Sequence, residues 1–129
     1  MNYPDDCKYS PEHEWLRIEG PDGVLGITDF AQDELGDVVF VELPEVGDSF
    51  DGGEEIGTIE SVKAVAEIYT PVGGEILAVN ESLEDQPELL NSDPHGEGWL
   101  VRVRIRDVEE TKKLMTAGEY AELVGQNGA

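Results

Sequence analysis

The sequence predicts a mostly β fold with small helices, organised as one domain over residues 1–129. The chain contains 15 glycines and 7 prolines that recur at short intervals, a rhythm typical of short strands joined by turns. The clearest helical patterns lie just after residue 28 and in the C-terminal part. At 129 residues the chain is long enough to bury one core and too short for two.

The expected strands are apolar or alternating runs bounded by turn residues. A Gly-Pro-Asp-Gly turn at residues 20–23 joins the first two strands into a hairpin. Residues 38–43 form a continuous apolar run before Pro44, which predicts a buried strand. In residues 99–106 apolar residues alternate with arginines that either neutralise nearby acids or dock a partner. The expected strands are residues 14–19, 24–27, 38–43, 55–60, 65–69, 75–79 and 99–106.

Short helices are expected between and after these strands. Thr28 can cap a helix over residues 28–35, and Gly36 suits the position after its last turn. Asp107 followed by Glu110 resembles a capping box and predicts a helix with Val108 on its apolar face. The remaining expectations are a helical turn or strand start at residues 87–90, a final helix at 119–124 and a frayed end from Gln126.

A weak internal repeat relates residues 46–51 to residues 79–84. It aligns Gly47 with Asn80, and both residue types tolerate a left-handed backbone. The repeat is either a chance similarity in an acidic chain or the trace of two related β-units that pack face to face.

The composition is strongly acidic, with 30 Asp and Glu, 8 Lys and Arg, and a net charge of −22. This balance argues against binding nucleic acid or an anionic membrane, because both need a cationic face. No run approaches the roughly 18 apolar residues of a membrane span. The charge is either a solvated surface suited to a salty cytoplasm or a means of steering brief encounters with basic-rimmed partners.

The numbers of cysteines and histidines indicate the redox compartment of the protein and whether it can bind a metal ion. Cys7 is the only cysteine, so no internal disulfide can form, and the N-terminus lacks a secretory signal pattern. We therefore expect a reducing, cytoplasmic location. With one cysteine and two distant histidines, no metal site is expected.

Lys63 is the lone basic residue of the acidic stretch 18–101. It lies in a turn of small residues at 61–64, between two expected strands. In one interpretation it is an exposed lysine loosely paired with Glu60 or Glu67, worth about 0–1 kcal/mol. In the other, it is a primary amine that points away from the body of the protein for a modifying enzyme.

The lysine turn and its surroundings resemble a known family. Residues 60–64 (ESVKA) and 69–76 (YTPVGGEI) resemble the lipoyl-lysine hairpin of the H-protein family of the glycine cleavage system. The resemblance covers about residues 8–124. Lipoyl domains of 2-oxoacid dehydrogenases share only the hairpin, and biotin carriers flank their lysine with methionines. Further matching segments are residues 9–15, 26–32, 35–44, 89–94 and 96–100.

The resemblance implies a hybrid-barrel sandwich of the lipoyl/biotinyl-carrier type, with peripheral and C-terminal helices. It also implies that lipoate is joined by an amide to Lys63, as N6-lipoyl-lysine. Such a protein is a monomeric carrier of the aminomethyl group of glycine and has no catalytic residue of its own. An alternative role is a lipoyl relay that donates lipoate to other lipoyl-dependent enzymes.

The resemblance further implies four partners: a pyridoxal-phosphate-dependent glycine decarboxylase (P protein), a folate-dependent aminomethyltransferase (T protein), dihydrolipoamide dehydrogenase (L protein) and a lipoate-attaching enzyme. In the family the loaded arm folds back toward the segment that matches residues 12–15. Glu14 is the first candidate to bind the carried amine, and Glu12 and Glu67 are secondary candidates. The family often has a small polar residue in place of Glu12 and an aspartate in place of Glu67. His13 is expected to be packed or hydrogen-bonded, since an enzyme built on it would lack a nucleophile.

Overall fold

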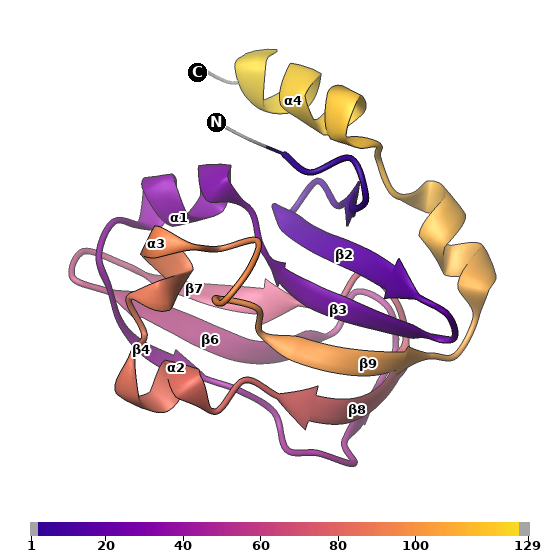
Figure 1. Ribbon diagram of the computed structural model, residues 1–129, viewed down its shortest axis with the longest axis horizontal. Helices are drawn as coiled ribbons and strands as arrows, with labels where there is room; N and C mark the ends of the chain where they lie inside the picture. Colours follow the sequence, from indigo (N-terminus) through magenta and orange to yellow (C-terminus); the bar gives the residue numbers. More distant parts are fainter. Residues whose placement is uncertain (1–2, 127–129) are drawn as a thin grey trace.

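The computed structural model describes residues 3–126, in which two antiparallel sheets form the body and small helices surround them (Figure 1). The larger sheet has the order β1-β2-β3-β9-β8-β5 and the smaller has the order β4-β6-β7. The strands are β1 Lys8–Tyr9, β2 Glu14–Glu19, β3 Asp22–Ile27, β4 Val38–Glu42, β5 Ser49–Phe50, β6 Glu55–Ser61, β7 Val65–Tyr69, β8 Gly74–Val79 and β9 Val101–Ile105. The helices are α1 Asp29–Leu35, α2 Ser82–Asp85, α3 Leu89–Ser92, the 3₁₀ helix η1 Val108–Lys113 and α4 Ala117–Gln126.

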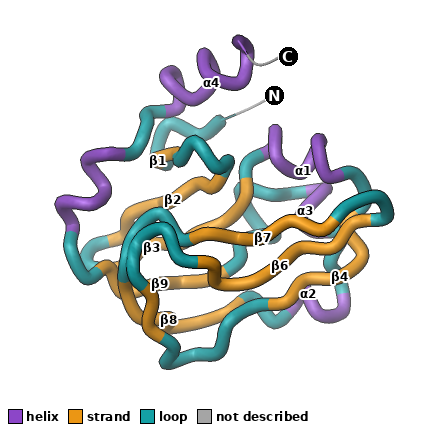
Figure 2. The backbone as a smooth tube through the Cα atoms, turned by 180° about the vertical axis from the view of Figure 1, so that it is seen from behind, coloured by secondary structure: helices purple, strands orange, loops and turns teal. Residues whose placement is uncertain are grey.

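The main core is formed by the facing surfaces of the two sheets (Figure 2). Leu25 and Val103 of the larger sheet and Ile59 and Ile68 of the smaller one are all buried in it. A second, aromatic-rich cluster brings helix α4 against β1 and β2. The predicted mostly β sandwich with small and C-terminal helices is therefore confirmed. Among the described residues the two sheets remain separate and do not close into one barrel.

The first hairpin forms as predicted, with a tighter turn. β2 and β3 pair as far as Glu19 and Asp22, so only Gly20 and Pro21 connect them. Gly20 has a φ of +65°, a conformation that glycine adopts without steric cost. The other expected strands are present with ends shifted by small amounts, whereas the two-residue strands β1 and β5 were not predicted.

The prediction of a buried strand over residues 38–43 is wrong in its burial. Val38 and Val41 of β4 face the core, but Val39 is 48% and Phe40 55% exposed. β4 is an edge strand, and its pairing with β6 shifts register between Val38 and Phe40. Such an irregularity bends an edge strand and turns consecutive side chains out of the sheet's alternation. Only part of the apolar run, including Val38 and Val41, is therefore buried in the core.

The segment after β9 also differs from its prediction. Asp107 caps η1 by accepting a hydrogen bond from the Glu109 backbone N–H. Glu110 does not complete a capping box, because its carboxylate accepts a hydrogen bond from the Gly73 N–H at 2.9 Å. Val108 is 61% exposed and does not face the core.

The other helical expectations have mixed outcomes. Helix α1 has the predicted Thr28 cap and ends at Gly36. Residues 87–90 lead into helix α3, and α2 was not predicted. Helix α4 is longer than the expected 119–124 and includes Gln126, where fraying was expected. Residues 127–129 lie outside the described residues.

The internal repeat does not produce two copies of one unit. Its first half contains strand β5, and its second half runs from the end of β8 into helix α2. Gly47 has a φ of +96°, but Asn80 does not share the left-handed conformation. The Asn80 side-chain amide instead donates hydrogen bonds to the carbonyls of Glu97 and Trp99. The similarity therefore does not reflect equivalent backbones at these positions.

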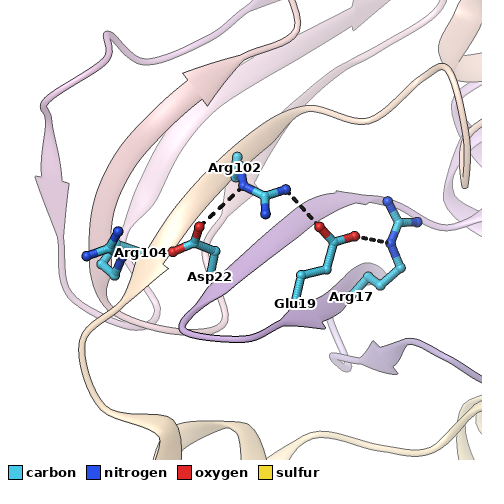
Figure 3. A network of polar contacts seen from close by, with 5 residues as sticks. All are labelled: Arg17, Glu19, Asp22, Arg102 and Arg104. Atoms are coloured by element: carbon cyan, nitrogen blue, oxygen red, sulfur yellow. Dashed lines mark hydrogen bonds and ion pairs between the residues drawn. The ribbon is translucent and has the colours of Figure 1, made fainter.

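The arginines of β9 form a network with the acids of the first hairpin (Figure 3). Arg102 contacts Glu19 at 2.9 Å and Asp22 at 3.4 Å, while Arg104 contacts Asp22 at 2.8 Å. Arg17 pairs with Glu19 at 3.0 Å. Hydrogen bonds from Arg17 and Arg104 are the largest causes of the lowered pKa values of Glu19 and Asp22, respectively. These arginines therefore neutralise neighbouring acids.

Within residues 3–126, every helix is too short or too polar to cross a membrane.

The contact between Gly26 and Trp15 gives a test of the second cluster. The two residues pair across β2 and β3, and a Cβ added to Gly26 would lie 2.5 Å from the indole ring. We expect Gly26→Ala to lower the free energy of unfolding by about 1–3 kcal/mol, measured in urea. Gly118→Ala is the control, because nothing lies within 4 Å of the added Cβ, and its effect should stay below about 1 kcal/mol. Equal losses in both variants would contradict the account.

Candidate functional site

Lys63 is presented by a tight turn at the end of the β6–β7 hairpin. The backbone N–H of Ser61 donates to the Ala64 carbonyl at 2.8 Å, and the Ser61 hydroxyl accepts from the Ala64 N–H at 3.1 Å. Ser61 is buried while Lys63 is exposed. One serine therefore closes the turn from inside and leaves the amine outside.

The tip of the hairpin is also held by the loop between α1 and β4. The Val62 N–H donates to the Asp37 carbonyl at 3.0 Å. Gly36 has a φ of +78°, and a Cβ placed on it would lie 3.4 Å from Lys63 Cε. The lysine stem thus leans toward Gly36, although we expected it to point straight away from the body. Among residues 3–126, no ion pair includes Lys63, so the loose pairing with Glu60 or Glu67 of the first interpretation is not formed.

A cleft of about 380 Å³ lies beside the hairpin. Its walls come from the segment before β2, helix α1 and the inner half of the β6–β7 hairpin. Glu12, Glu14 and Glu67, the three candidate arm contacts, all line it. Its other lining residues are His13, Ile27, Phe30, Ala31, Glu34, Leu35, Ile59, Ala66 and Ile68. The cleft therefore combines an apolar floor with carboxylates.

Glu14 is the most buried of these carboxylates, with 3% exposure. The Ser10 hydroxyl donates to Glu14 Oε1 at 2.7 Å and accepts from the Glu14 N–H at 3.1 Å. Burial raises the pKa of Glu14 to about 7; the nearby Glu12 adds to the rise, and the hydrogen bond from Ser10 opposes it. Glu14 therefore keeps its proton to a higher pH than an exposed glutamate does.

One tyrosine hydroxyl from α4 connects two walls of the cleft. The Tyr120 hydroxyl lies 2.7 Å from His13 Nδ1 and 2.7 Å from the Thr28 hydroxyl. Thr28 in turn caps helix α1 through the Ala31 N–H at 3.1 Å. His13 adopts a φ of 71°, and burial lowers its pKa. His13 is hydrogen-bonded, as expected.

The distance from Lys63 to the cleft suits a long flexible arm. Residues 66–68 line the cleft and lie three to five positions beyond the lysine along the hairpin. At about 3.3 Å per residue, this is roughly 10–17 Å. A lysine extended by an eight-carbon acyl chain reaches about 14 Å from its Cα. The stem already leans toward Gly36, which follows the cleft-lining Leu35.

Sequence comparisons identify the family. A family model described as "Glycine cleavage H-protein" matches residues 7–127. The glycine cleavage system H proteins of Bacillus cereus (strain AH820) and Bacillus cytotoxicus are 52% and 53% identical to the chain over 127 residues. These alignments cover 98% of this chain and 100% of each relative. The chain belongs to the glycine cleavage H-protein family.

The fold agrees with this membership. The crystal structure of a glycine cleavage system H protein from Mycobacterium marinum matches with a TM-score of 0.86 at 42% identity. The match covers 98% of this chain and 100% of that chain. H proteins are lipoate-bearing carrier components, and the exposed lysine with an adjacent cleft fits such a group.

Sequence reasoning singled out the lysine and the three glutamates but missed the residues that hold them in place. Ser10 and Ser61 were visible only as small polar residues of larger motifs. Tyr120 lies more than 100 residues from His13, so no local pattern could connect them. The positive φ of His13 had no signal either, because only a few per cent of non-glycine residues adopt this conformation.

The raised pKa of Glu14 predicts a specific pH dependence. A carboxyl that is neutral when folded stabilises the protein below its ordinary pKa of 4.5, and this contribution is lost as the pH rises to about 7. Glu14→Gln abolishes this ionisation. Between pH 4.5 and 7 the free energy of unfolding of the parent should therefore fall by about 3 kcal/mol through Glu14, and that of the variant should not. Urea denaturation of both proteins across this pH range measures the difference. Parallel pH profiles for the two proteins would contradict a buried, neutral carboxyl.

Proposed function

We propose that Lys63 is the lipoyl attachment residue of this chain and that residues 1–129 act as one carrier domain. The chain is an H-protein component of the glycine cleavage system. In that role it carries the aminomethyl group of glycine from the decarboxylase (P protein) to the folate-dependent aminomethyltransferase (T protein). Dihydrolipoamide dehydrogenase (L protein) then reoxidises the carrier. The observation that carries the assignment to Lys63 is its exposure on a serine-locked turn beside a cleft of the right reach.

Attachment converts the Lys63 ammonium into an amide. The deprotonated Nζ attacks the carbonyl carbon of an activated lipoyl group, such as an acyl adenylate. A C–N bond forms, the bond from that carbon to the leaving oxygen breaks with its electron pair, and the lysine proton passes to a base. No electrons are exchanged in this step. The tether then becomes uncharged, which favours its entry into a largely apolar cleft.

The cleft residues hold the carried amine and exclude water. When bound, the lipoyl group supplies a disulfide that accepts the aminomethyl unit and two electrons. Glu14 binds the amine as an ammonium through a charge-assisted hydrogen bond. Because a nearby cation favours the carboxylate, docking lowers the pKa of Glu14 from about 7, and the carboxyl gives up its proton. Glu12 and Glu67 act as further carboxylate contacts at the cleft.

In this role the chain performs no bond-making step alone. The decarboxylase, the transferase, the dehydrogenase and a lipoate-attaching enzyme perform the chemistry, and the chain acts as a monomeric shuttle between them. The assignment includes no metal and no catalytic residue. We propose a reducing, cytoplasmic location, because a single cysteine cannot form an internal disulfide. Cys7 is buried, and burial raises its pKa to about 12, which argues against a redox role for this thiol.

The test is Lys63→Arg in a reconstituted system containing the P, T and L proteins. The variant keeps the fold, because Lys63 is exposed, but arginine cannot form the amide. We expect complete loss of carbon dioxide release from glycine, with an unchanged unfolding transition. Substantial turnover by Lys63→Arg would refute the assignment. A lipoylated parent that releases no carbon dioxide would instead favour the relay role, in which lipoate passes to other enzymes.

A further inference from the structure

Exposed apolar side chains gather around Lys63. Of the seven large apolar side chains exposed among residues 3–126, four lie at this end of the smaller sheet. Val62 (70% exposed) precedes the lysine and Val65 (65%) follows its turn. Phe40 (55%) and Val39 (48%) lie on the neighbouring edge strand β4. We call Val39, Phe40, Val62 and Val65 the tip surface.

Strand register places two of these side chains, Phe40 and Val65, on one face together with Glu60. Phe40 pairs with Glu60 across β4 and β6, and Glu60 pairs with Val65 across β6 and β7. Paired residues on neighbouring strands point to the same side of a sheet. The three side chains therefore form a row on the outer face, just before the lysine turn.

The fold gains little from this arrangement. Val38 and Val41 supply the buried contacts of β4, whereas Val39 and Phe40 remain in solvent. Apolar side chains grouped on the surface of an otherwise acidic protein mark an interaction site more often than a structural need. The row also contains a carboxylate at its centre, so the complementary partner surface is an apolar groove with cationic groups.

The position of the tip surface distinguishes between partners. Enzymes that act on the far end of a lipoyl arm work about 14 Å from the lysine backbone and do not need to touch the turn. The enzyme that forms the amide must bring its acyl donor within bonding distance of Lys63 Nζ itself. Its active-site rim therefore has to cover the residues on both sides of the turn.

We propose that the tip surface is the docking site for the lipoate-attaching enzyme, which meets it with an apolar groove rimmed by Lys or Arg. This inference rests on Lys63 being the attachment residue. Phe40 and Val65 provide the apolar contacts on either side of Glu60, and Glu60 steers the encounter. The surface is used once in the life of the protein and is then free.

The test measures lipoyl loading of the apo-chain by a purified ATP-dependent lipoate ligase with lipoate and ATP, followed by intact mass. The variants are Phe40→Thr and Val65→Thr, because threonine suits an exposed strand position while removing most of the apolar surface. Val46→Thr and Val108→Thr are matched controls, since these valines are 62% and 61% exposed and lie elsewhere. We expect kcat/KM for loading to fall about tenfold for Phe40→Thr and severalfold for Val65→Thr, with the controls unchanged.

Glu60→Gln examines the steering charge separately. We expect a two- to threefold lower kcat/KM for loading at low salt and a weaker salt dependence than in the parent. A salt dependence equal to that of the parent would contradict a cationic rim opposite Glu60.

Fully loaded variants, prepared by long incubation, provide the second readout. They should release carbon dioxide from glycine at the parental rate with the P, T and L proteins. Equal loading rates for tip and control variants would overturn the inference, as would normal loading with a loss of glycine turnover. A third outcome is that loading is unchanged, the parent forms dimers and Phe40→Thr is a monomer. This result would overturn the inference and show that a second copy of the chain binds this surface instead. A parent that is never loaded at Lys63 would refute the proposed function itself.

Discussion

The arrangement depends on how the β6–β7 hairpin ends. Ser61 satisfies the turn with its backbone N–H and its hydroxyl, and the Asp37 carbonyl holds the neighbouring Val62 N–H. These contacts use the polar groups of the tip on the protein side, so the lysine side chain is left to solvent. A tether fixed at one end in this way lets the rest of an arm move while its origin stays in place. The loop that contains Asp37 follows directly from α1, so the origin of the arm is attached to one wall of the cleft.

The buried carboxyl of Glu14 is suited to bind a cation in the cleft. Ser10 provides only one side-chain hydrogen bond to Glu14, which does not offset the loss of water around the carboxyl. The pKa of Glu14 is thus raised toward neutral pH, and a neighbouring ammonium favours loss of its proton. Tyr120 extends this site to the C-terminal helix, since its hydroxyl meets both His13 and Thr28. Packing at the far end of the chain therefore helps to define the cleft.

Much of this architecture was predictable because its signals are local. Alternation, turn residues and the Thr28 cap located most strands and α1, and the isolated Lys63 stood out among acids. The burial of β4 was not predictable, because a register shift at a sheet edge depends on the partner strand. The bond from Tyr120 to His13 joins distant segments, which no periodicity reveals. The resemblance placed Glu12, Glu14 and Glu67 near one another, and the fold brings them to one cleft.

The central claim is that one exposed amine on a rigid turn becomes the tether of the carried group. Intact mass and peptide mapping of the protein purified from its native host test it most directly. The account predicts a gain of roughly 190 Da, the size of a lipoyl amide, on the peptide that contains Lys63. Protein that supports glycine cleavage while Lys63 is unmodified would contradict it.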